Sequence, residues 1–263
     1  MKKAIFFDID GTLIDCINGI TDIRPNVKKA IRNLQSQGHY VFIATGRPYA
    51  FIYDNLLDFG FDGLILANGA QVIINGKTIY KHPIDKNLIK DLIQDFHKYD
   101  IEYILQSSLY SYLNDDFNDL KEYYTHYNIP TKHILNDYSY NDDLDVYKME
   151  ILYKTDKAKE FCHSLENDDF DLMTYDDFPV CEIYSKNNSK ASGILKALEY
   201  LDIDIEDSYA FGDGRNDIEM LSTVGCGIAM GNASDSVKIH AKEITDSVLD
   251  DGIASGIEKF ILS

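Results

Sequence analysis

The stretch Ala4-Ile5-Phe6-Phe7-Asp8-Ile9-Asp10-Gly11-Thr12-Leu13 decides the fold class of this chain. A continuous apolar run ends in two aspartates one residue apart, and a glycine follows. Such a run is typical of a strand buried on both faces of a parallel sheet. The aspartates then lie at the carboxyl end of the strand, where open α/β sheets place their ligands. Asp8 and Asp10 share one face of the strand, so the pair predicts a small polar site that needs a cation or a shared proton.

Two other interpretations of this stretch, a simple turn and an EF-hand loop, have to be weighed against a polar site. Taken alone, the aspartates could simply end a strand, with Asp10-Gly11 as a turn. An EF-hand loop is excluded, because Gly11 follows Asp8 too closely and no helical pattern precedes it. The rest of the chain decides between a turn and a site.

Composition limits the class of protein. The 263 residues are 45% hydrophobic and 26% charged, with a net charge of −19. This acidic excess argues against general nucleic-acid binding and against binding to anionic membranes. No apolar stretch approaches the roughly 20 residues of a membrane span. Four scattered cysteines without a Cys-x-x-Cys pair, and an N-terminus without a signal-peptide pattern, lead us to expect a cytoplasmic protein.

The region after the first strand predicts a βαβ unit. Apolar residues at helical spacing over 26–37 precede a second buried run over 40–44, which ends in Thr45-Gly46-Arg47. A right-handed crossover places Thr45 at the same sheet edge as Asp8. We expect a further helix over 49–59, a strand over 63–67 and a hairpin over 71–80 with Asn75-Gly76 at its tip.

The composition changes near Pro83 and returns near residue 186. Between them the chain is rich in tyrosine, aspartate and asparagine, with a polar loop over 136–145. Helical patterns cover 86–99, 116–127 and 156–166, and strand-like runs cover 101–105, 109–113, 146–153, 170–175 and 180–184. This alternation predicts an inserted α/β domain that acts as a lid. We therefore predict a parallel-sheet core formed by 1–82 and 186–263, interrupted by a second domain over 83–185.

The second part of the core carries two more polar signals. Lys190 opens a predicted helix that runs to about Leu201. A strand over 208–211 ends in Gly212-Asp213-Gly214-Arg215-Asn216-Asp217, and further helical and strand patterns follow to the end of the chain. A single parallel sheet brings these two signals to the edge that holds Asp8 and Thr45.

These four signals, in this order and spacing, resemble the motifs of the haloacid dehalogenase (HAD) superfamily. The match is to its Cof-like branch, subfamily IIB, which contains small-molecule phosphatases. Asn68-Gly69-Ala70 also resembles a segment of this branch. The resemblance covers nearly the whole chain. It implies a Rossmann-like parallel-sheet core with an inserted α/β cap domain of the C2B type.

The resemblance also implies a mechanism. Asp8 would attack phosphorus and form an aspartyl-phosphate, and Asp10 would protonate the leaving oxygen and then activate water. Mg²⁺ would be bound by Asp8, by the backbone carbonyl of Asp10 and by Asp213. Lys190 would balance the charge of Asp8 and of the phosphate, and Asp217 would position Lys190.

Phosphate-binding residues follow from the same motifs. Thr45, the amides near Gly46, and Asn216 would contact phosphate oxygens, and Arg47 would pair either with substrate or with an acidic residue. Each residue also has a plainer interpretation when taken alone. Thr45 could cap the next helix, Asn216 and Asp217 could cap the helix that follows them, and Lys190 could be a surface lysine.

We therefore predict a Mg²⁺-dependent phosphatase that hydrolyses a small phosphorylated metabolite, such as a sugar phosphate. A phosphomutase of the phosphomannomutase type and a non-catalytic phosphate-binding regulatory protein are the alternatives. Neither nucleic acid nor a membrane is an expected partner, and the chain should be a monomer or a small homo-oligomer. Candidate specificity positions are Val180, Cys181, Glu182 and Tyr184.

Overall fold

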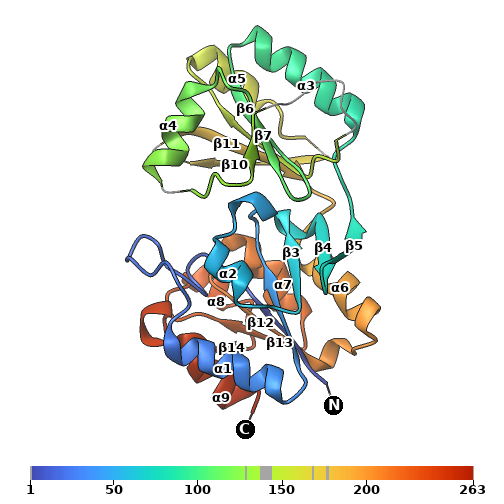
Figure 1. The fold of residues 1–263 in the computed structure, drawn as a ribbon, viewed down its shortest axis with the longest axis vertical. Helices are drawn as coiled ribbons and strands as arrows, with labels where there is room; N and C mark the ends of the chain where they lie inside the picture. The colour runs from blue at the N-terminus through green and yellow to red at the C-terminus, as the bar shows by residue number, and fades with distance from the viewer. Residues whose placement is uncertain (1, 128, 137–143, 168, 176–177, 263) are drawn as a thin grey trace. The chain divides into compact units, whose positions relative to one another are not determined.

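The computed structural model describes residues 2–127, 129–136, 144–167, 169–175 and 178–262. They fold into two compact units (Figure 1). The first comprises Met1–Gly46, Asp54–Lys81 and Ser189–Ser263, and the second comprises Arg47–Tyr53 and His82–Asn188. The loop predicted over 136–145 lies mostly outside the described residues. Among the described helices, none combines the length and the apolar content that crossing a membrane requires.

The first unit is built on an eight-stranded sheet with the order β14-β13-β12-β1-β2-β3-β4-β5. The strands are β1 (Ala4–Phe7), β2 (Tyr40–Ala44), β3 (Gly63–Leu66), β4 (Gln71–Ile74), β5 (Lys77–Lys81), β12 (Ser208–Gly212), β13 (Cys226–Ala229) and β14 (Glu243–Ile244). Neighbours from β14 to β3 pair in parallel, and β3, β4 and β5 pair antiparallel. All four residues of β1 are buried, which confirms the strand predicted from the apolar run.

The order of the strands places Asp8 at a switch point of the sheet. After β1 the chain continues to β2 on one side, and it later returns to β12 on the other side of β1. Phe7 lies in register with Ile43 of β2 and with Phe211 of β12. The residues that follow these strands therefore meet at one edge, which is where open α/β sheets bind their ligands.

Helices cover both faces of this sheet, because successive strand residues point to opposite sides. One core contains Phe6 and Phe42 with residues of α6 (Lys190–Leu201) and α7 (Ile218–Thr223). On the other side, Phe7 stacks on Phe211 with 5.3 Å between ring centroids. There α9 (Gly252–Phe260) packs so closely that a Cβ on Gly256 would lie 2.5 Å from the Phe211 ring. The helix α1 (Pro25–Ser36) packs against α9 (Figure 1).

The continuous helix predicted over 49–59 is wrong. A 3₁₀ turn at Tyr49–Phe51 ends at Ile52, whose ψ of 133° is extended, and α2 covers only Asp54–Asp58. Phe51 is buried in the second unit, against Tyr124. Leu56 is buried within α2, which belongs to the first unit. Burial of neighbouring residues in different cores outweighs the helical pattern of the sequence.

The second unit has a six-stranded sheet with the order β10-β11-β9-β6-β7-β8. Its strands are β6 (Glu102–Gln106), β7 (Ser111–Leu113), β8 (Ile134–Leu135), β9 (Lys148–Leu152), β10 (Phe170–Tyr175) and β11 (Phe178–Ser185), and its helices are α3 (Lys86–Lys98), α4 (Asn118–His126) and α5 (Asp156–His163). Each helix and strand predicted in this region is present, and β8 is an additional strand. One sheet face packs against α3 and α5, and the other packs against α4.

Candidate active site

Lys190 is the centre of the polar cluster at the edge of the first sheet. Its Nζ lies 2.6 Å from Oδ1 of Asp8 and 2.6 Å from Oδ1 of Asp217. Lys190 is only 1% exposed, so it is not the surface lysine of the plainer interpretation. Ser189 caps the helix that Lys190 begins through a capping box with Ser192, which fixes the start of α6 and therefore the origin of the lysine side chain.

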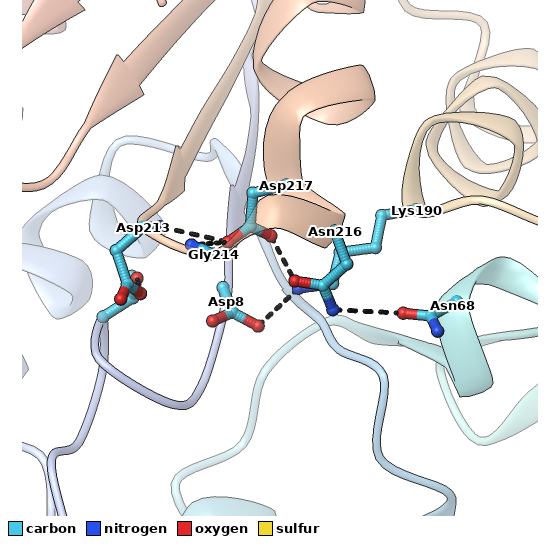
Figure 2. A network of polar contacts seen from close by, with 8 residues as sticks. Asp8, Asn68, Lys190, Asp213, Gly214, Asn216 and Asp217 are labelled. Atoms are coloured by element: carbon cyan, nitrogen blue, oxygen red, sulfur yellow. Dashed lines mark hydrogen bonds and ion pairs between the residues drawn. The ribbon is translucent and has the colours of Figure 1, made fainter. Parts of the chain in front are cut away.

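Asp217 links Lys190 to the loop after β12. Its second carboxylate oxygen accepts hydrogen bonds from the backbone N–H of Asp213 at 3.0 Å and of Gly214 at 2.9 Å. Its side chain makes no capping hydrogen bond to α7, the helix that it precedes. Gly212 permits this packing, since a Cβ there would lie 2.6 Å from the Asp217 carboxyl carbon. Asp217 is therefore fixed on both of its oxygens, as Figure 2 shows.

Asp213 is held by the loop that follows Asp8. The Oγ1 of Thr12 donates to its Oδ1 at 2.9 Å. Gly11 has a φ of +80°, and a Cβ on it would collide with the Asp213 carboxylate. This role of Thr12 was not predicted from the sequence, although its position directly after Asp10-Gly11 indicates proximity to the site.

Asp10 lies near the same carboxylates. The chain turns sharply after it, with the N–H of Gly11 donating to the carbonyl of Ile14 at 2.8 Å. The Asp10 side chain is exposed, and its negative charge contributes to raising the pKa values of Asp8 and Asp213. Asp8, Asp10, Lys190, Asp213 and Asp217 therefore lie together, as predicted from the sequence.

The electrostatics of the cluster are dominated by its carboxylates. Burial, and next the charge of Asp217, raise the pKa of Asp8 well above its ordinary value, although the Lys190 ammonium opposes them. Burial likewise raises the pKa of Asp213 to about 6. Burial alone would lower the pKa of Lys190, but Asp217 and Asp8 outweigh it and hold that pKa above its ordinary value. One ammonium thus faces two buried carboxylates, with Asp213 and Asp10 nearby, which leaves an excess of negative charge.

This donor set fits a divalent cation. One carboxylate oxygen from each of Asp8, Asp213 and Asp217 lies within 4.8 Å of the others. Both oxygens of Asp217 are already bonded to Lys190 and to backbone amides. In contrast, Oδ2 of Asp8 and Oδ2 of Asp213 accept no hydrogen bond from any residue that the structure describes. Hard oxygen ligands of this kind suit Mg²⁺ and similar ions.

A second polar group follows β2. Thr45 is 1% exposed, its N–H donates to the carbonyl of Ile65 at 2.9 Å, and its carbonyl accepts from the N–H of Asn68 at 3.1 Å. Thr45 is not a helix cap, because the next turn has Pro48 as its N-cap residue. Gly46 is covered by two amides, since a Cβ on it would lie 3.0 Å from Oδ1 of Asn68 and 3.4 Å from Nδ2 of Asn216.

The remaining candidates belong to the second unit. Arg47 donates from Nη1 to the carbonyl of Phe51 at 2.6 Å, and its guanidinium lies 5.1 Å from the ring centroid of Tyr53. Val180 and Cys181 are core residues on opposite faces of the sheet. Glu182 pairs with Lys148 at 2.5 Å, and the hydroxyl of Tyr184 donates to Asp171 at 3.1 Å.

Comparison with known proteins gives consistent matches over the chain. The family model of haloacid dehalogenase-like hydrolases matches residues 5–257. The Bacillus subtilis (strain 168) protein named "Putative phosphatase YkrA" is 33% identical over 98% of this chain and 97% of its own length. A hypothetical protein from Geobacillus kaustophilus HTA426 has a similar structure, with a TM-score of 0.88, 30% identity and full coverage of both chains. The HAD subclass IIB sugar phosphatase BT4131 has a TM-score of 0.78 and 28% identity, over 98% of this chain and 99% of its own.

Proposed function

Because the chain belongs to the haloacid dehalogenase-like hydrolase family, we propose that it is a Mg²⁺-dependent phosphatase acting through an aspartyl-phosphate on Asp8. The observation that carries this proposal is the position of the Asp8 carboxylate. One oxygen is held 2.6 Å from Lys190, and the other accepts no hydrogen bond from the described residues. A fixed carboxylate with one open oxygen suits a nucleophile.

The proposed reaction has two steps. Oδ2 of Asp8 forms a bond to phosphorus while the ester P–O bond breaks, and Asp10 gives its proton to the leaving oxygen. Asp10 then takes a proton from water as that water attacks the acyl-phosphate, which releases inorganic phosphate and restores the Asp8 carboxylate. The Asp10 side chain is exposed to solvent, whereas Asp217 is fully buried, and this exposure suits the proposed proton exchange with water.

The other residues of the first unit bind and orient the phosphoryl group. Lys190 balances the charge of Asp8 and of a phosphoryl oxygen, and Asp217 positions Lys190. Thr45, Gly46 and Asn216 contact phosphoryl oxygens. Arg47 remains a predicted phosphate-binding residue.

The proposed ligands of Mg²⁺ are the Asp8 carboxylate, through the oxygen that does not attack phosphorus, the Asp213 carboxylate and the backbone carbonyl of Asp10. When bound, the ion supplies positive charge to the phosphoryl group and to the excess of carboxylates around Lys190. This accounts for how an acidic chain, with a net charge of −19, accepts an anionic substrate.

We propose a sugar phosphate as the substrate class, because a similar structure is a sugar phosphatase of the same family. We also propose a reducing, cytoplasmic setting, because the four described cysteines, Cys16, Cys162, Cys181 and Cys226, form no disulfide.

A panel of phosphorylated metabolites, assayed with Mg²⁺ for release of inorganic phosphate, tests the proposed function. We expect phosphate release from one or more sugar phosphates without formation of an isomer. Isomer formation without free phosphate would instead identify a phosphomutase. Phosphate binding without turnover of any ester would identify a non-catalytic binding protein.

A further inference from the structure

Residues 67–69, between β3 and β4, form a left-handed turn. The φ angles are +48° at Ala67, +53° at Asn68 and +90° at Gly69. Side chains with a Cβ rarely adopt this conformation, because the Cβ approaches the following carbonyl oxygen. Ala67 and Asn68 are nevertheless 2% and 4% exposed, so the strained turn is built into the interior. Strain of this kind persists only where the surrounding structure enforces it, and it is concentrated at functional sites.

Two elements of the candidate active site enforce the turn. The N–H of Asn68 donates to the carbonyl of Thr45, at the end of β2. A Cβ on Gly69 would collide with the carbonyl of Ser189, the residue before Lys190, and a Cβ on Gly193 would lie 3.0 Å from Cα of Gly69. The turn is therefore fixed between the strand end that carries Thr45 and the helix start that carries Lys190.

Only the oxygen of the Asn68 side-chain amide has a hydrogen-bond partner among the described residues. Its Oδ1 accepts a hydrogen bond from Nδ2 of Asn216 at 3.3 Å. Its own Nδ2 donates to no residue that the structure describes, although Asn68 is 4% exposed. Figure 2 shows the Asn216 amide directed at Oδ1 of Asn68. The Nδ2 group is not among the fully buried unpaired atoms, so it keeps contact with solvent and offers two N–H donors beside Gly46 that no described residue uses.

We propose that Asn68 is a further substrate-binding residue, whose Nδ2 donates to an oxygen of the bound phosphoryl group. This inference rests on the proposed function. Asparagine suits the position for two reasons, because it tolerates the left-handed conformation better than most residues and because it carries two N–H donors. Its Oδ1 also orients Asn216, so both amides present donors to the same anion.

Two substitutions distinguish the contribution of the left-handed backbone at residue 68 from that of the side-chain amide. In Asn68→Gly the left-handed conformation is kept without strain, and the amide is lost. In Asn68→Asp the shape and the Oδ1 acceptor for Asn216 are kept, but a negative oxygen replaces the donors. Asn75 offers matched controls, since it is an exposed asparagine with a φ of +49° at the tip of the β4–β5 hairpin. Asn75→Gly and Asn75→Asp make the same chemical changes away from the site.

The measurement is the affinity for inorganic phosphate, by titration calorimetry in excess MgCl₂. A hydrogen bond to a charged group predicts that Asn68→Gly weakens phosphate binding by about tenfold or more. Asn68→Asp should weaken it further, through repulsion, and both Asn75 variants should match the wild type. The KM for p-nitrophenyl phosphate should rise in parallel.

Phosphate affinity of Asn68→Gly within about twofold of the wild type would overturn the inference, because a lost charged hydrogen bond costs more than that. Wild-type affinity in Asn68→Asp with weak binding in Asn68→Gly would also overturn it, since Asn68 would then act only through Asn216. A wild type that binds phosphate but hydrolyses no ester would refute the proposed function, while the comparison of variants would still decide the role of Asn68. A wild type that binds no phosphate would refute both.

Discussion

Lys190 and Asp217 form an ion pair that is almost completely removed from solvent, with 2.6 Å between Nζ and Oδ1. Their side chains are 1% and 0% exposed. The other oxygen of Asp217 holds two backbone amides of the loop that carries Asp213. One carboxylate therefore sets the positions of both the lysine and a proposed metal ligand.

Replacement of Asp217 by asparagine should disrupt this link. The amide of Asp217→Asn has one acceptor oxygen, which can serve Lys190 or the loop amides but not both. Breaking a buried pair in this way should lower the free energy of unfolding by about 3 kcal/mol. We expect kcat to fall by about tenfold or more while KM changes little, since geometry and not contact with substrate is lost. Steady-state kinetics and urea unfolding measure both effects, and a variant with unchanged kcat would contradict the positioning role.

Removal of Lys190 should be more damaging than removal of another lysine from the same helix. Lys190→Met leaves Asp8 and Asp217 facing one another without a cation, so we expect activity to fall by about a hundredfold or more. Lys196 is the matched control, because it is exposed on α6, where it pairs with Glu199 at 3.0 Å and lies over the ring of Tyr80. Lys196→Met should keep normal activity, since exposed pairs contribute little. Similar losses in the two variants would mean that the site does not depend on Lys190.

Much of this site could be predicted from the sequence because its residues follow strand ends. The apolar runs before Asp8, Thr45 and Asp213 give the strands, and parallel pairing brings their carboxyl ends together. The helix that Lys190 opens follows from its apolar spacing, but the place of Lys190 in the site followed from the resemblance to the haloacid dehalogenase superfamily.

Other features could not be predicted, because they depend on contacts between distant segments. The break at Ile52 follows from burial of Phe51 and Leu56 in different cores, which no local pattern encodes. The role of Thr12 depends on the approach of Asp213, 201 residues away. The left-handed conformation of Ala67 is enforced by packing and not by its own preference.

Metal removal and pH should affect the carboxylate cluster together. Protein treated with EDTA should lose activity and regain it with Mg²⁺, and Mg²⁺ should raise the Tm of the metal-free wild type but not of Asp213→Asn. Because the pKa of Asp213 is raised to about 6, protons compete with the ion below that pH. We therefore expect Mg²⁺ affinity to increase as the pH rises from about 5 to 7. Full activity after complete metal removal would contradict the assignment.

The stability of the second unit should depend on the protonation of Glu150. Glu150 lies directly opposite Glu182 across the β9–β11 pair, and burial followed by the charge of Glu182 raises its pKa to about 8. A carboxyl group whose folded-state pKa is raised favours folding below its ordinary pKa, and this contribution is lost as the pH rises toward about 8.

Between about pH 5 and 8, the wild type should therefore lose stability relative to Glu150→Gln, on the order of 1 kcal/mol per pH unit. Glu160→Gln, on the exposed surface of α5, is the control and should follow the wild type. Denaturant unfolding at several pH values measures the difference. Parallel pH profiles for wild type and Glu150→Gln would show that Glu150 has an ordinary pKa.

The most direct test of the account is the rate of p-nitrophenyl phosphate hydrolysis by Asp8→Asn. Asparagine keeps the size of the side chain and an acceptor for Lys190, so circular dichroism should show the wild-type fold. Without a carboxylate nucleophile the rate should fall by about a thousandfold or more, in the range seen when covalent catalysis is removed. A folded Asp8→Asn variant that hydrolyses the ester at the wild-type rate would contradict the mechanism.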